Sequence, residues 1–208
     1  MCSLSPVKLE FSPNVVAAFF GALILNVLYH YESIVQNEWF GYPQEWMPTV
    51  SATTGDHYPG RSWYQYAMAT AGLPKGILLY LLFFSGNHIS LGIELLHTLL
   101  AGSWTFVTSS DNLRKHEIGM ILFVVSTVGR LAATRRRRLL GLMLTELLGM
   151  GLLYYVHKVM MVPGAYSVYA VVEWLFSATA IYSEYIRLVS LSFGKSEMHI
   201  RMQLDGSK

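Results

Sequence analysis

Charge is scarce in this sequence: of 208 residues, 13% are charged and 53% are hydrophobic. That balance excludes an ordinary soluble domain of this length and indicates a polytopic membrane protein. The single cysteine, Cys2, excludes an intramolecular disulfide. No basic segment with a small-residue cleavage site precedes the first apolar stretch, so we interpret that stretch as a retained signal anchor.

Recognisable catalytic and ligand-binding motifs are missing as well. The sequence has no nucleophile elbow, no phosphate-binding loop and no histidines or cysteines at zinc-like spacing. We therefore expect neither a cofactor nor a metal. The formal net charge of +2 is concentrated in short loops and does not form a basic surface, so no nucleic-acid partner is expected.

Long apolar stretches dominate the chain. A membrane-spanning helix needs about 20 predominantly apolar residues, and six stretches qualify, near 14–31, 66–86, 89–108, 117–134, 139–157 and 165–188. The sequence predicts an all-α polytopic membrane protein with about six transmembrane helices. We divide it into a membrane domain, 1–188, and a short polar tail, 189–208.

The orientation follows from the distribution of arginine. Arg130 and the run 135–138 lie between the fourth and fifth apolar stretches, and Lys and Arg concentrate in cytoplasmic loops. With six spans, both termini are then cytoplasmic, which agrees with Lys8 and the basic tail. The run also resembles a nuclear-localisation or nucleic-acid patch, but its place between two spans favours a topology signal that contacts anionic lipid.

The segment 32–65 after the first span has a different character. It is long for a loop and rich in turn residues, and loops of this kind are usually functional or disordered. Its aromatic content argues against disorder, so we predict a structured first lumenal loop. The alternative is an interfacial aromatic belt that only seats the protein in lipid. The aromatic residues concerned are Trp39, Tyr42, Trp46, Tyr58, Trp63 and Tyr64.

A series of short motifs resembles a known family. Residues 48–61 read PTVSATTGDHYPGR, and GNH at 86–88, SSDNLRKHE at 109–117, HK at 157–158 and GAYSVYAVVEW at 164–174 follow in order. Together they resemble the Frag/DRAM/Sfk membrane proteins, in particular the branch called post-GPI-attachment-to-proteins factor two. They are also similar to the N-terminal half of the fungal cell-wall protein that remodels GPI lipids. The resemblance covers about residues 31–184.

The resemblance implies GPI-anchor lipid remodelling in the Golgi or the endoplasmic reticulum membrane, by reacylation of a lyso-GPI. The partners would then be a GPI-anchor lipid or GPI-anchored protein and the surrounding membrane lipids. One alternative is a subunit that recognises the GPI lipid for a separate catalytic membrane partner. Another is a membrane scaffold or regulator without chemistry. Whether the chain is itself an acyltransferase stays open at this point.

Polar residues at the expected lumenal ends of the spans are the candidate site. For proton transfer we expect a histidine, whose free pKa of about 6.5 suits this role, with a carboxylate partner. The candidates are His116, Glu117, Asp56 and His157. Arg61 and Lys158 suit an inositol phosphate. Ser51, Tyr169 and Glu173 complete the predicted substrate-binding set. The alternative is that His116-Glu117 caps a span and that His157-Lys158 snorkels.

Three further ionisable residues lie inside predicted spans. Glu94 and His97 share one helix face, where ionisable groups are expected to pair, as a site or as structural contacts between helices. Glu146 is ambiguous in the same way. The region around Lys75 departs from the pattern that the resemblance leads us to expect, so no role is transferred to that lysine.

Overall fold

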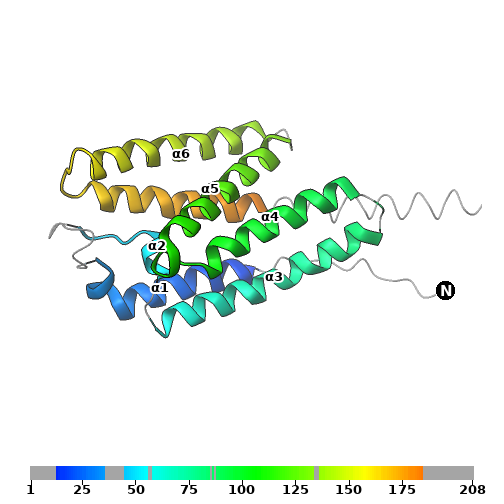
Figure 1. The fold of residues 1–208 in the computed structure, drawn as a ribbon, viewed down its shortest axis with the longest axis horizontal. Helices are drawn as coiled ribbons and strands as arrows, with labels where there is room; N and C mark the ends of the chain where they lie inside the picture. The colour runs from blue at the N-terminus through cyan, green and yellow to red at the C-terminus, as the bar shows by residue number, and fades with distance from the viewer. Residues whose placement is uncertain are drawn as a thin grey trace, which may run out of the picture.

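The computed structural model describes residues 13–35, 45–55, 58–84, 86, 88–133 and 136–184. Within these ranges the chain is helical (Figure 1). Predictions for Lys8, Asp56, Arg135 and the tail 189–208 concern residues outside the described ranges. The prediction of an all-α polytopic membrane protein is confirmed.

Six long helices match the six predicted stretches in order. Three of them, α3, α5 and α6, are long and apolar enough to cross a membrane by length and composition, and a shorter apolar helical segment covers Phe19–Val35. The long helices are α1 Pro13–Val35, α3 Gly60–Phe84, α4 His88–Phe106, α5 Ser109–Ala133, α6 Arg137–Lys158 and an unlabelled helix, 165–184. A four-residue helix, α2 Val50–Thr53, lies between α1 and α3.

The helices run up and down, so that the connections between them gather at two ends of the bundle (Figure 1). One end carries α2 and the connections α4–α5 and α6–(165–184), and we call it the α2 end. The opposite end carries the connections α3–α4 and α5–α6, including the exposed Arg136, Arg137 and Arg138. The helix α3 starts at Gly60, directly after Pro59, and so takes in the last part of the predicted loop. Gly86, at φ +68°, separates α3 from α4.

The position of Arg130 differs from the prediction. The sequence predicts that Arg130 lies with the other arginines in a cytoplasmic loop, but it lies inside α5 and its side chain is buried. The Arg130 guanidinium pairs with carboxylates of other helices, which is why an arginine is tolerated there. The predicted orientation of the bundle in the membrane therefore depends on the remaining arginines of the α5–α6 connection.

Two clusters of buried apolar side chains lie within the described residues. The first surrounds α2 and consists of Phe19, Leu23, Val50 and Tyr64, with Trp104 and Trp174 packed against it. The second joins α5, α6 and helix 165–184 through Leu131, Met143, Phe176 and Ala180. Because Val50 belongs to the first core, α2 is part of the packed bundle. Tyr64 is buried there, whereas Tyr58 and Trp63 are exposed and remain compatible with an aromatic belt.

Candidate functional site

The helix α2 is held among four long helices at one end of the bundle. Thr49 caps it, since the Thr49 hydroxyl accepts a hydrogen bond of 3.0 Å from the Ala52 amide. The Asn26 side chain of α1 donates to the Thr53 carbonyl. Val50 packs against Tyr64 of α3. These contacts fix α2 in the interior, where irregular backbone needs partners from the protein.

Ser51 of α2 contacts two further helices. The Ser51 amide and hydroxyl donate to Glu173 Oε1 at 3.2 and 3.1 Å. The Ser51 hydroxyl also lies 3.4 Å from the sulfur of Met120 in α5. Ser51 and Glu173, which the sequence predicts as substrate-binding residues, are therefore in direct contact although 122 positions separate them.

A strap formed by residues 45–49 runs along the start of helix 165–184. The Glu45 carboxylate accepts from the amides of Gly164 and Ser167 at 3.0 and 2.7 Å and from the Ser167 hydroxyl at 2.6 Å. A carboxylate at the first amides of a helix is stabilising because these groups lack intrahelical partners. The Ser167 oxygen in turn accepts from the Trp46 and Met47 amides. The strap is thus fixed by backbone contacts.

Two more contacts continue the strap toward α2. The Trp174 indole donates to the Pro48 carbonyl at 2.9 Å. The Thr49 amide donates to the Tyr166 hydroxyl at 3.3 Å. Tyr166 also lies against His157, with ring centroids 5.2 Å apart. The strap thereby holds α2 at a fixed place beside Glu173 and near the end of α6.

Several buried polar atoms on the long helices near α2 have no hydrogen-bond partner within the described ranges. They are Asn26 Oδ1, Trp104 Nε1, His116 Nε2 and Glu173 Oε2. Buried polar atoms are normally paired, and each exception calls for an explanation such as strain, a ligand or chemistry. We call these four side chains, together with Ser51, the α2 cluster. The cluster offers both donors and acceptors, a combination that suits hydroxyl groups.

The predicted proton-transfer residues are not all brought together. His116 is 1% exposed, and its Nδ1 contacts the Val107 carbonyl at 2.8 Å. Glu117 is exposed, because consecutive helical residues point about 100° apart. His157 is buried beside Tyr166 at the end of α6. Asp56 lies outside the described residues.

The predicted phosphate-binding residues occupy different settings. Arg61, at the start of α3, forms an ion pair of 2.5 Å with Asp111 at the start of α5. Asp111 also accepts from the amide and hydroxyl of Thr108 at 3.0 and 3.1 Å. Lys158 is exposed at the end of α6. The Tyr169 ring lies 6.1 Å from that of Tyr154. Arg61 and Lys158 share the α2 end of the bundle.

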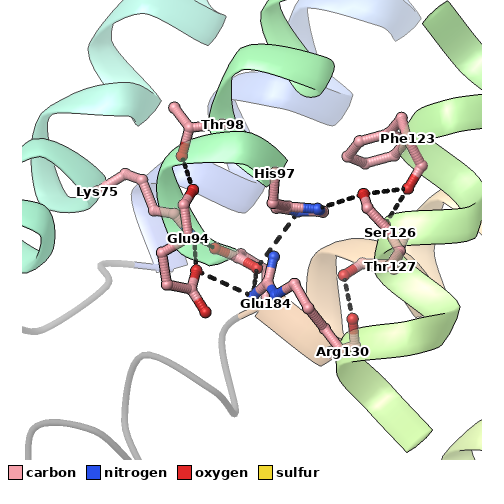
Figure 2. Close-up of polar contacts among 11 residues, drawn as sticks. Lys75, Glu94, His97, Thr98, Phe123, Ser126, Thr127, Arg130 and Glu184 are labelled. Carbon is pink, nitrogen blue, oxygen red and sulfur yellow. Dashed lines mark hydrogen bonds and ion pairs between the residues drawn. The ribbon is translucent and has the colours of Figure 1, made fainter. Parts of the chain in front are cut away.

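A second polar assembly lies among α3, α4, α5 and helix 165–184, toward the opposite end (Figure 2). Lys75 pairs with both Glu94 and Glu184. Arg130 Nη2 lies 2.6 Å from Glu184 and 3.3 Å from Glu94. We call these residues, with His97, the ion network. Two cations and two carboxylates balance, so each buried charge has an opposite partner.

His97 connects the ion network to α5. Its Nδ1 lies 2.9 Å from the Ser126 hydroxyl, and its Nε2 lies 3.8 Å from Glu184. The Ser126 hydroxyl donates to the Phe123 carbonyl, so its oxygen is the acceptor for a proton on His97 Nδ1. The His97 ring also stacks on Phe123 at a centroid distance of 5.0 Å. The expectation that Glu94 and His97 find partners at this depth is met.

The ion network as a unit is not predicted from the sequence. The sequence predicts no role for Lys75 or Glu184 and predicts a loop position for Arg130. The available signal was the presence of several charges within apolar stretches, since such charges pair across helices. Glu146 has a neutral partner on another helix, because the Thr179 hydroxyl donates to it at 2.9 Å. In the part of the chain that the structure describes, no group of three or more His, Cys, Asp or Glu side chains forms a metal-like cluster.

Comparisons with known proteins add a family relationship. Residues 14–130 match the Frag1/DRAM/Sfk1/Cwh43P N-terminal domain. The protein named cwh43 from Schizosaccharomyces pombe is 39% identical over 179 residues, covering 76% of this chain and 18% of the relative. The chain thus spans less than a fifth of that relative's length. No solved structure matches the chain.

Proposed function

Because this chain belongs to the family of the Frag1/DRAM/Sfk1/Cwh43P N-terminal domain, we propose that it remodels GPI-anchor lipids by reacylating a lyso-GPI. The observation that carries the proposal is the α2 cluster. It includes Ser51 from the motif at 48–61 and Glu173 from the motif at 164–174, and it holds buried polar atoms without partners in the described ranges. A buried polar group set among apolar helices suits the head group of a lipid.

The arrangement of charge along the bundle supports a lumenal site. Arg136, Arg137 and Arg138 lie at the end opposite to α2. The positive-inside rule assigns that end to the cytoplasm, so the α2 cluster faces the lumen of the Golgi or the endoplasmic reticulum and both termini are cytoplasmic. GPI anchors carry their head groups on the lumenal side, as the resemblance implies. The proposed substrate and the proposed site then share one face of the membrane.

The anionic head group requires cations near the α2 cluster. Arg61 and Lys158 lie at this end of the bundle, and a guanidinium binds a phosphate through two parallel hydrogen bonds. Arg61 already pairs with Asp111, so phosphate binding exchanges one anionic partner for another. We expect Arg61→Ala to weaken binding of the lyso-GPI, whereas Lys115→Ala, at an exposed position of α5, leaves binding unchanged. Equal affinity of both variants and wild type would remove Arg61 from the site.

The proposal is tested on the purified chain in lipid nanodiscs. Lyso-GPI and an acyl donor, either an acyl thioester or a phospholipid, are added, and the lipid product is identified by mass spectrometry. A new diacyl product at rates above those of empty nanodiscs supports reacylation by this chain. Absence of both binding and product would overturn the proposal.

A second function, recognition of the GPI lipid on behalf of a separate catalytic partner, is favoured by one observation. The match covers 18% of the relative from Schizosaccharomyces pombe, and chemistry located in the rest of that protein would leave recognition of the lipid to the matched part. In the nanodisc experiment this function predicts lyso-GPI that is bound and unchanged. Addition of a membrane extract that contains the partner then restores product.

A further inference from the structure

The two carboxylate oxygens of Glu173 have different surroundings. Oε1 accepts both hydrogen bonds from Ser51, at 3.2 and 3.1 Å. Oε2 has no partner within the described ranges, although the residue is only 7% exposed. A buried oxygen without a partner is costly, and the surrounding protein holds it in place all the same. One oxygen thus orients the carboxylate, and the other is buried without a partner in the described ranges.

The orientation of Glu173 is set by Ser51, which is itself held in place. Ser51 belongs to α2, which Thr49 caps and whose Thr53 carbonyl accepts a hydrogen bond from Asn26. One residue after Glu173, Trp174 is bonded to the strap through the Pro48 carbonyl. A group whose own hydrogen bonds fix its rotamer meets one requirement for a catalytic base, which is preorganisation. The pair formed by Ser51 and Glu173 therefore resembles an oriented base with its positioning residue.

A second unpaired atom belongs to the same cluster. His116 lies one helical turn before Met120, on the same face of α5, and Met120 contacts Ser51. His116 Nδ1 is occupied by the Val107 carbonyl, whereas Nε2 has no partner in the described part of the chain. Glu117 is exposed. Glu173, rather than Glu117, is thus the carboxylate with a free oxygen in the buried cluster.

We infer that Glu173 binds the free hydroxyl of the lyso-lipid through Oε2 and accepts its proton during acyl transfer, with Ser51 as the positioning residue. This inference rests on the proposed function. In the step, the hydroxyl oxygen attacks the carbonyl carbon of an acyl ester or acyl thioester. The new ester C–O bond forms, and the bond from that carbon to the donor's oxygen or sulfur breaks. The proton moves to Glu173 and then to the departing alkoxide or thiolate, without oxidation or reduction.

A purely structural role for Glu173 is the competing explanation, because its contact with the Ser51 amide also supports the start of α2. Glu173→Gln separates the two roles. The amide oxygen of glutamine still accepts from Ser51, so α2 keeps its contact, but the neutral side chain is no longer a proton acceptor. A structural role predicts little change in this variant, and a catalytic role predicts lost turnover with intact binding.

The experiment compares wild type, Glu173→Gln and the control Glu32→Gln, at an exposed position of α1, in nanodiscs. We expect Glu173→Gln to keep the unfolding midpoint and the lyso-GPI affinity within about threefold and to lose roughly 10²- to 10⁴-fold in kcat, the usual contribution of a general base. Ser51→Ala should lower kcat less, with unchanged KM, because it releases one of two contacts. Wild-type turnover in Glu173→Gln would overturn the inference while leaving the proposed function standing.

A binding measurement decides the case in which wild type binds lyso-GPI and makes no product. Affinity is measured for lyso-GPI and for an analogue with hydrogen in place of the free hydroxyl. We expect wild type to prefer lyso-GPI by about tenfold or more, as for a hydrogen bond to a charged group, and Glu173→Ala to lose this preference. A wild type without preference, or a Glu173→Ala variant that retains it, would overturn the inference. If wild type does not bind lyso-GPI at all, the proposed function is overturned as well.

Discussion

Neutralising Glu94 is expected to destabilise the bundle strongly. The Glu94 side chain is fully buried, and it pairs with Lys75 of α3 and with Arg130 of α5. Glu94→Gln keeps the size and shape of the side chain but removes the negative charge. Lys75 and Arg130 then share Glu184 alone, and the ion network carries an excess positive charge in the interior.

The magnitude follows from burial. Removing one partner of a buried ion pair costs about 3–5 kcal/mol, because the remaining charge is left without compensation. For a chain of this length, 1 kcal/mol corresponds to about 2–4 °C in the unfolding midpoint. We therefore expect the midpoint of purified Glu94→Gln in nanodiscs to fall by roughly 6–20 °C. The hydrogen bond from Thr98 persists, since it ends on the Glu94 carbonyl.

A double variant tests the reasoning. Adding Lys75→Met to Glu94→Gln removes one cation and one anion and leaves the Arg130–Glu184 pair, at 2.6 Å, as a balanced pair. The double variant should be more stable than the sum of the single effects predicts, by about 0.5–3 kcal/mol. The exposed Glu117→Gln should change stability by less than about 0.5 kcal/mol. Additive effects, or a Glu94→Gln as stable as the control, would refute the assignment of these charges as a coupled network.

Two further predictions concern packing and orientation. Gly60→Ala should lower the free energy of unfolding by about 1–3 kcal/mol, because a Cβ at Gly60 would lie 1.7 Å from Asn26 Oδ1. The measurement is the thermal unfolding midpoint of the variant. In sealed microsomes, a membrane-impermeant maleimide should label Arg137→Cys on a Cys2→Ser background directly, whereas Tyr58→Cys on the same background should react only after detergent is added.

Controls for these two predictions come from the same chain. Gly72→Ala places a Cβ where nothing lies within 4 Å, so its midpoint should stay at or above that of wild type. If the two alanine variants behave alike, close packing at Gly60 is not what selects glycine. Immediate labelling of Tyr58→Cys with protection of Arg137→Cys would reverse the proposed orientation.

The composition and the apolar stretches predicted the fold class, because a bilayer imposes length and hydrophobicity on each spanning helix. The predicted stretches and the observed helices agree in number and order. The boundaries differ where polar residues continue a helix beyond its apolar part. The helix α5 starts at Ser109 and α3 at Gly60, and the aromatic residues after Gly60 had been assigned to the loop.

Local sequence predicted some features of the site and left others open. Ser51 and Glu173 belong to motifs of the resemblance, and the structure brings them into contact. Adjacency in sequence, however, suggested His116 and Glu117 as a pair. On a helix these neighbours point to different sides, and one is buried while the other is exposed. Their proposed joint role in proton transfer stays a prediction.

Sequence alone thus determined that the chain is a bundle of membrane helices, which residues carry the family motifs and which charges must find partners. Only the tertiary structure decided which residues pair with these charges. Lys75, Glu94, Arg130 and Glu184 come from four helices, and the strap meets helix 165–184 across more than 100 positions. A charge in an apolar stretch usually pairs with a charged or polar group of another helix. Helical periodicity predicts only which face of its own helix the charge lies on, and the packing of the bundle decides which helix supplies the partner.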